Sequence, residues 1–191
     1  MLDTGFPRAD AENDFARARR RQAFSATARW LRRGRGSGDL VRLDEVTGAL
    51  DWRGQRQLGL HTIPLNTIIG TASARRDFDW QFRPTSDRVR PRWQRLALAQ
   101  RRGEPIPPIE VYRVGGCHFV SDGHHRVSIA AATGQHVIDA YVTEVRTALP
   151  PAPGCKVTDI RPTTRSSSNS AVSPGWPEPQ AWHGFPRRDK R

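Results

Sequence analysis

The sequence has few lysines, few cysteines and no long apolar run. Only two of its 31 basic residues are lysines, an arginine bias that genome composition explains as readily as phosphate recognition. No apolar run approaches the ~20 residues that a membrane-spanning helix needs, and Met1 to Asp10 lacks the pattern of a secretion signal. We therefore expect a cytoplasmic protein with no membrane association. Cys117 and Cys155 lie in a predicted strand and in a Pro-rich tail, so they indicate neither a disulfide framework nor a zinc cluster, and we interpret both as free thiols.

The charge is strongly positive but evenly spread. The formal net charge is +12; residues 1–60 and 61–146 each hold twelve basic and eight acidic residues, and residues 147–191 hold seven and three. Each segment therefore carries the same +4. Clustered basic side chains gain affinity for nucleic acid by displacing counterions from phosphates, so this even distribution permits DNA binding without indicating it. The 36% hydrophobic content predicts one core with loose ends.

Residues 1–60 are predicted to form a basic N-terminal helix and a linker. From Asp10 to Leu31 the sequence has no Pro or Gly, and apolar residues recur near helical spacing. The arginines of this helix form a basic surface, which we interpret first as a solvated helical face. Contact with a nucleic-acid backbone is the alternative. A short helix at Asp44–Leu50 and a polar connection at Gly54–Gly59 complete the segment.

Residues 61–146 have the pattern of a compact α/β domain. A strand is predicted at Thr62–Ile69, and an amphipathic helix at Asp87–Arg102. The dipeptide Gly115-Gly116 separates the apolar runs IEVYRV and CHFVS, which is a strong signal for a β-hairpin with a two-residue turn.

An Ala-rich helix, from Val127 to Thr133, follows this hairpin, and a last strand is predicted at Val137–Val145. The connection from the strand at 117–121 through that helix predicts a right-handed βαβ unit with two parallel strands. Residues 147–191 are rich in Pro and Ser with almost no apolar periodicity, which is typical of a disordered tail. The predicted fold class is therefore α/β (α+β): a small mixed-sheet domain with a β-hairpin and a right-handed βαβ unit, preceded by an N-terminal helix and followed by a disordered tail.

The turn between the hairpin and the Ala-rich helix has the composition of a phosphate site. The N–H groups in the first turn of a helix lack intrahelical partners and lie at the positive end of the helix dipole. Gly123 lets a ligand approach the backbone, and Arg126 adds a bidentate charged contact. His124 and His125 add donors that titrate near neutrality. Asp122, the candidate catalytic residue, has three uses: capping the helix, orienting a histidine, or holding Mg²⁺ against the phosphates.

Taken with its context, this turn resembles the ParB/sulfiredoxin superfamily, in particular the N-terminal domains of ParB-like chromosome-partitioning proteins. The resemblance runs from about Ile63 to Val145 and is carried by the succession IPPIEVYRVGG, FVSDGHHRVSIAAATG and IDAYV. In this superfamily the Gly-x-x-Arg turn binds nucleotide phosphates, which implies that role here for Gly123, His124, His125 and Arg126. The family also has an arginine-bearing loop after its first strand, and Arg75 and Arg76 stand in the matching place.

The sequence departs from both branches of this superfamily. Sulfiredoxins place their catalytic Cys directly after the turn Gly, where this chain has His124, and Cys117 lies six residues before Gly123. The resemblance therefore does not imply sulfinic-acid reduction. ParB proteins that hydrolyse CTP carry acidic and Asn residues beside the upstream Arg, where this chain reads ASARR and leaves Asp77 or Asp79 to substitute. The Pro/Ser-rich tail offers neither the helix-turn-helix domain nor the dimerisation segment of a partitioning protein.

The leading hypothesis is a ParB-like nucleotide- or phosphate-binding regulatory module that acts on or with DNA. Its nucleotide would be CTP or ATP, Mg²⁺ is a possible cofactor, and a homodimer is possible. The alternative is a small phosphoryl-transfer or nucleotide-hydrolysing enzyme on the same fold, in which Asp122 or Asp77 assists a metal ion. A nuclease needs a metal-binding carboxylate cluster, which the scatter of Asp77, Asp79 and Asp122 does not favour. We predict no dedicated metal site, because His124 and His125 project about 100° apart on a helix.

Overall fold

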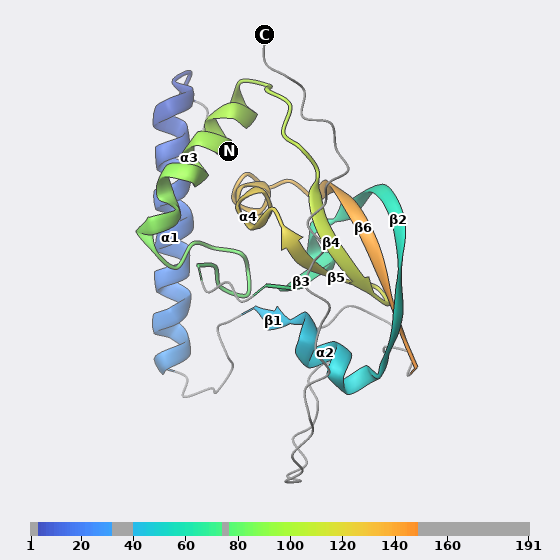
Figure 1. Ribbon diagram of the computed structural model, residues 1–191. Coiled ribbons are helices and arrows are strands. Elements are labelled where there is room, and N and C mark those ends of the chain that lie inside the picture. The colour runs from blue at the N-terminus through green and yellow to red at the C-terminus, as the bar shows by residue number, and fades with distance from the viewer. Residues whose placement is uncertain (1–3, 32–39, 74–76, 149–191) are drawn as a thin grey trace.

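The computed structural model describes residues 4–31, 40–73 and 77–148, which form one sheet flanked by helices (Figure 1). Arg75 and Arg76 lie outside the described residues, as does the predicted tail from residue 149 onward. Within the part of the chain that the structure describes, no helix is long and apolar enough to cross a membrane.

The sheet has six strands in the order β1-β3-β5-β4-β6-β2. The strands are β1 Val41–Arg42, β2 Trp52–Pro64, β3 Ile68–Thr71, β4 Ile109–Val114, β5 Cys117–Asp122 and β6 Val137–Thr147. The pairs β1–β3, β3–β5 and β4–β6 are parallel, whereas β4–β5 and β2–β6 are antiparallel. The fold is therefore a mixed α/β fold with a mixed sheet, as the sequence predicts.

The β-hairpin is confirmed, but the predicted parallel βαβ unit is wrong. Gly115 and Gly116 connect β4 to β5, with Val114 paired to Cys117. Helix α4, His124–Ala132, then leads from β5 to β6. Strand β6 pairs in parallel with β4, and β4 is antiparallel to β5, so β5 and β6 run in opposite directions. Strand β6 cannot pair with β5, because β3 and β4 already occupy both edges of β5. It pairs instead with the open edge of β4 and takes the direction of β4.

The predicted strand Thr62–Ile69 is divided in the structure. Its first residues end β2, a 3-10 turn follows at Leu65–Thr67, and Ile68 begins β3. Proline has no N–H group to donate to a strand ladder, and β2 ends at Pro64.

The polar connection predicted at Gly54–Gly59 is also wrong, because these residues lie inside β2, which is 13 residues long. Register shifts in the β2–β6 pairing fall beside Gly54 and Gly59. The glycines therefore mark β-bulges in an edge strand, not a break between elements. Most residues of β2 are exposed, which explains why the strand lacks an apolar alternation in the sequence.

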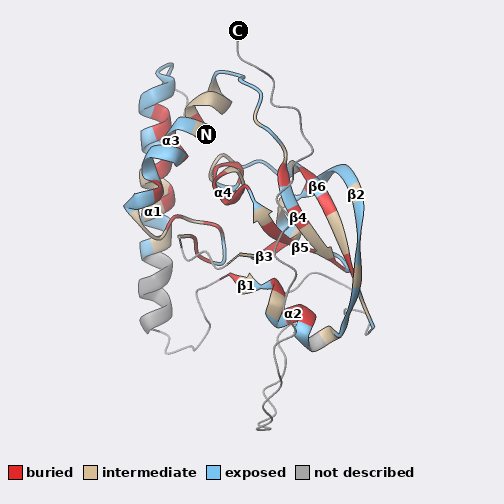
Figure 2. Cartoon of the chain, in the orientation of Figure 1, coloured by how far each residue is buried: buried red, intermediate tan, exposed pale blue. Residues whose placement is uncertain are grey.

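Three helices cover one face of the sheet (Figure 1). They are α1, Pro7–Leu31; α3, Arg90–Arg101, which a 3-10 turn at Asp87–Val89 precedes; and α4. All three were predicted, α1 from Asp10 rather than Pro7. Their buried side chains form one cluster with strand residues, and the Phe15 ring of α1 packs edge-on against Trp93 of α3 with centroids 5.4 Å apart. As Figure 2 shows, α1 carries buried residues on one side and exposed residues on the other.

Helix α2, Leu43–Leu50, covers part of the opposite face and confirms the predicted short helix. Leu43 and Val46 of this helix pack with strand side chains such as Ile69 and Phe119 in a second buried cluster. Neighbouring strand residues belong to different clusters: Val120 to the first, Phe119 to the second. This alternation is what a sheet buried on both faces requires.

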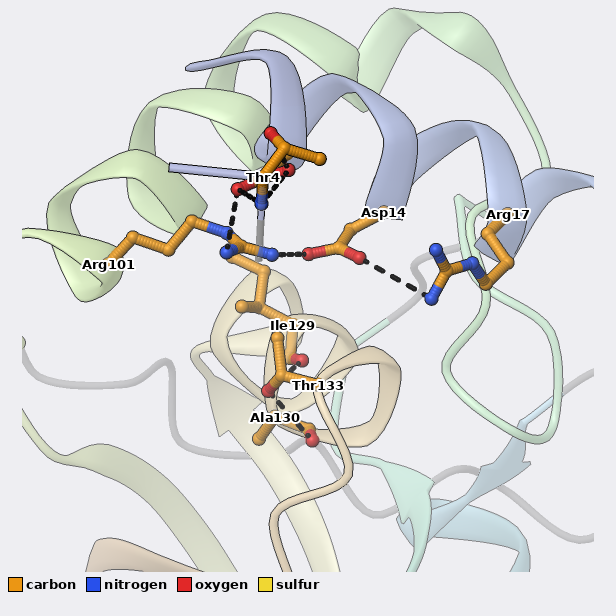
Figure 3. Close-up of polar contacts among 8 residues, drawn as sticks. Thr4, Asp14, Arg17, Arg101, Ile129, Ala130 and Thr133 are labelled. Atoms are coloured by element: carbon orange, nitrogen blue, oxygen red, sulfur yellow. Dashed lines mark hydrogen bonds and ion pairs between the residues drawn. The ribbon is translucent and has the colours of Figure 1, made fainter. Parts of the chain in front are cut away.

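A buried ion cluster fastens α1 to α3 (Figure 3). Arg101 donates to the Asp14 carboxylate, and its Nη1 lies 3.5 Å from Oδ2 of Asp10. The three side chains are at most 7% exposed. Separating α1 from α3 would leave buried charges uncompensated, which is costly. The ion cluster therefore stabilises the packing of α1 on α3. Residues before β2 thus share the core of residues 61–146, and the boundary expected at residue 61 falls within β2.

Candidate functional site

Gly123 connects β5 to α4 in a conformation that glycine alone adopts easily. Its φ is +104°, in the left-handed region, and it is the N-cap residue of α4. A Cβ atom added there would lie 2.5 Å from Cγ2 and 2.8 Å from Cβ of Ile109. Both the dihedral angle and the neighbouring β4 side chain therefore require a residue without Cβ.

The first turn of α4 presents its backbone at the end of β5. The helix's own hydrogen-bond ladder begins at Val127, whose N–H donates to the Gly123 carbonyl at 3.0 Å. The N-cap residue is Gly123, which has no side chain to cap the helix, and the Asp122 carboxylate accepts a hydrogen bond from Arg126. The N–H groups that precede Val127 therefore lie at the positive end of the helix, as an anion site requires.

Arg126 holds this turn against the loop before β4. Its Nη1 donates to the carbonyl of Pro107 at 2.6 Å and to that of Pro108, and its Nη2 donates to Asp122. The side chain of Arg126 is 12% exposed, whereas that of Asp122 is 55% exposed. The Arg126 guanidinium is therefore oriented by the two proline carbonyls, and its charge is neutralised by Asp122. An anion that binds Arg126 would have to displace the Asp122 carboxylate.

His124 and His125 are buried, contrary to the expectation of two accessible titrating donors. The His124 ring stacks on Phe78 with centroids 6.2 Å apart and an interplanar angle of 21°, and it also contacts Phe82. The His125 ring meets Phe78 edge-on at 5.2 Å. The two side chains therefore anchor α4 to the segment 77–84.

The segment that leads to Arg75 and Arg76 leaves β3 beside the start of α4. Thr71, the last residue of β3, has its hydroxyl oxygen 2.8 Å from Nε2 of His124. The same oxygen accepts a hydrogen bond from the N–H of Ser73 at 3.0 Å. Arg75 and Arg76 themselves lie outside the described residues, but the described residues before them are fixed to the turn.

The acidic residues considered for metal binding have separate roles. The Asp79 carboxylate is 2% exposed and accepts hydrogen bonds from the N–H groups of Gln81 and Arg83 and from Nε of Arg83. It therefore stabilises its own loop. Among residues 4–31, 40–73 and 77–148, no group of three or more His, Cys, Asp or Glu side chains is arranged to hold a metal ion.

His118 of β5 is a buried histidine away from the turn. Its Nδ1 lies 2.8 Å from the hydroxyl of Thr67. Burial, together with the smaller effect of the charge of Arg113, lowers the pKa of His118 to about 4. His118 is therefore neutral at pH 7. Its contact with Thr67 links β5 to the turn that precedes β3.

Cys117, expected to be a free thiol, is disulfide-bonded, so that expectation is wrong at this position. Cys155 lies outside the described residues. Sequence context could not show this bond, because disulfide formation depends on Cα atoms that approach within ~7 Å in the folded chain.

Comparisons with known proteins identify no family for this chain. No family model matches the chain, and no curated protein matches it. Among solved structures, the crystal structure of sulfiredoxin from Arabidopsis thaliana is similar, with 20% sequence identity and a TM-score of 0.34, over 47% of this chain and 86% of that one. A similarity at this level says nothing of a ligand.

Proposed function

We propose that the chain is a ParB-like nucleotide-binding regulatory module, in which the first turn of α4 binds the phosphates of CTP or ATP together with Mg²⁺. The observation that supports this most directly is the Arg126–Asp122 pair. The exposed Asp122 carboxylate contacts the guanidinium as a phosphate oxygen would. Gly123 keeps the adjacent backbone free of a Cβ atom.

Binding would replace one anion by another on Arg126. A nucleotide phosphate displaces Asp122, while the carbonyls of Pro107 and Pro108 keep the guanidinium in place. A second source of charge is the loop that carries Arg75 and Arg76, because Thr71 fixes the start of that loop beside His124.

The test is calorimetric titration of the full chain with CTP, ATP and ADP, each with Mg²⁺. We expect binding in the wild type and a loss of at least roughly tenfold in Arg126→Ala, since a charged hydrogen bond contributes about 1.5–3 kcal/mol. Arg95→Ala, which removes an exposed arginine of α3, is the matched control and should bind normally. Failure of the wild type to bind any nucleotide would refute the proposal. Unfolding curves of Arg126→Ala check that the turn survives without its clamp.

A second candidate is an enzyme of phosphoryl transfer or nucleotide hydrolysis, which the exposure of Asp122 favours. Its carboxylate lies at the turn and is 55% exposed, so it is accessible to Mg²⁺. Asp122→Asn separates the two candidates. A binding module should gain affinity, because the competing charge on Arg126 is gone. An enzyme should lose Mg²⁺-dependent phosphate release.

DNA is the partner that the surface of α1 suits best. Arg8, Arg20 and Arg21 are exposed on this helix, and the opposite side is packed in the core. Titration with a short duplex at two salt concentrations tests this contact, since phosphate contacts make affinity fall as salt rises. Removal of Arg20 and Arg21 together should reduce that salt dependence, whereas nucleotide binding at the turn should remain.

A further inference from the structure

A cavity of about 390 Å³ lies between α1, α4 and residues 81–83. Its lining includes Arg17, Arg21, Arg83 and Asp14, with small alanines of α1 and α4 between them. The α4 residues that line this α1–α4 cavity lie between 128 and 132, toward the C-terminal half of the helix. The cavity is therefore separate from the turn at Gly123.

The charge around the α1–α4 cavity is positive on balance. Three arginines line it against one aspartate. The Asp14 carboxylate is 3% exposed and lies between Arg101 and the lining residue Arg17, whose Nη1 is 3.8 Å from Oδ1 of Asp14 (Figure 3). Arg83 is positioned by Asp79 and donates to the carbonyl of Arg21 at 3.0 Å. These bonds fix the 81–83 segment onto α1 and shape the opening.

Ser128 contributes a buried hydroxyl to the wall of the cavity. The side chain is 3% exposed, and its oxygen accepts a hydrogen bond from the Trp93 indole N–H at 2.9 Å. A serine inside a helix usually donates its proton back to a carbonyl three or four residues earlier. No such bond, nor any other acceptor for this proton, is found among the described residues. Within the described part of the chain, the hydroxyl is therefore a buried donor without an acceptor at the edge of a basic cavity.

We propose that the α1–α4 cavity binds a small phosphate-bearing molecule, independently of the nucleotide proposed for the turn. Guanidinium groups match phosphate oxygens through paired hydrogen bonds, and the Ser128 hydroxyl adds a neutral donor. A phosphate group offers three acceptor oxygens to these donors, whereas a carboxylate offers two. The volume falls at the small end of the range of about 300–1,000 Å³ for small-molecule sites, and the alanines provide a short apolar floor.

The experiment is calorimetric titration of the full chain with glycerol 3-phosphate and with inorganic phosphate, and with acetate as the carboxylate probe at equal ionic strength. We expect saturable binding of the phosphates and little of acetate. Arg17→Gln and Ala131→Leu should each weaken binding roughly tenfold or more. The first removes a lining charge, and the second fills the cavity and leaves every charge in place. Arg20→Gln, which removes an exposed charge one residue outside this lining, is the matched control and should leave binding of the two phosphates unchanged.

Four outcomes would overturn the proposal. These are no saturable binding in the wild type, preference for acetate, equal weakening by Arg17→Gln and Arg20→Gln, and loss of binding in Arg126→Ala. Equal weakening would mean a diffuse basic surface of the kind that a nucleic acid uses. Loss in Arg126→Ala would place the phosphate at the turn. Ser128→Ala should weaken binding severalfold, and its unfolding curve shows whether the Trp93 N–H tolerates the loss of its acceptor.

Discussion

Replacement of Gly123 by alanine tests the geometry of the turn most directly. Two separate effects should destabilise this variant. The φ of +104° is unfavourable for a residue with a Cβ atom and costs about 1–2 kcal/mol. The new methyl group would also meet Ile109 at 2.5 Å, and Ile109 is fully buried. Overpacking of this kind costs about 1–3 kcal/mol, so the free energy of unfolding should fall by about 2–5 kcal/mol.

Gly134 provides the matched control, because it has the backbone strain without the contact. Its φ is +76°, and an added Cβ atom would meet nothing within 4 Å. Gly134→Ala should therefore cost only the dihedral part, about 1–2 kcal/mol. Urea unfolding of both variants, with equal m values, gives the difference. A difference below about 0.5 kcal/mol would refute the steric part of the reasoning, because the contact with Ile109 should then contribute nothing.

Three further predictions concern charges. The pKa of His118, lowered from 6.5 to about 4 by burial, means that the unfolded chain binds the extra proton between these values. The free energy of unfolding should therefore be highest above pH 6.5 and should fall by on the order of 2–3 kcal/mol as pH drops toward 4. A free energy of unfolding that stays constant from pH 7 to 4.5 in the wild type would contradict this. So would an equally steep fall in His118→Asn. Asp122→Asn should tighten nucleotide binding severalfold by calorimetry; weaker binding would mean that the carboxylate helps to hold the ligand. Arg101→Ala should lower the free energy of unfolding by about 3–5 kcal/mol, because two buried carboxylates lose the arginine that they share. The control Arg102→Ala removes an exposed arginine and should change the free energy of unfolding by less than about 0.5 kcal/mol. Similar losses in both variants would show that the buried ion cluster does not stabilise the fold more than an exposed arginine does.

The elements that were predicted well are those whose own residues decide them. The dipeptide Gly115-Gly116 between two apolar runs is enough for a hairpin, and the structure has one there. The helical spacing of apolar residues likewise located α1 and α3. The turn at Gly123 could be located because glycine, a helix start and an arginine stand within four residues of one another, whereas phosphate binding at this turn is still a prediction.

The parts that were missed depend on segments far apart in the chain. The partners of Arg126 are carbonyls 18 and 19 residues away, and the partner of His124 is Thr71, 53 residues away. No local pattern shows that a turn histidine stacks on Phe78 instead of facing solvent. For the same reason the sequence could not show that β6 would pair with β4, since the free edges of a sheet exist only after the other strands have paired.

The segment 77–84 touches both proposed sites and should couple them. Phe78 packs on His124 at the turn, while Arg83 lines the α1–α4 cavity. Asp79 makes the segment stiff by accepting from the Arg83 N–H and side chain. A nucleotide that shifts the turn should therefore change the affinity of the cavity for glycerol 3-phosphate, by a factor on the order of five or more.

Linkage requires the reciprocal effect to be equal: saturating glycerol 3-phosphate must change nucleotide affinity by the same factor. Both factors come from calorimetric titrations of one ligand with and without the other. In Arg17→Gln the cavity is disabled and the turn is untouched, so nucleotide affinity should no longer respond to glycerol 3-phosphate. A factor of one in the wild type, with both ligands bound, would show that the 77–84 segment holds the two sites without transmitting between them. A factor that persists in Arg17→Gln would mean that both ligands compete for the turn itself.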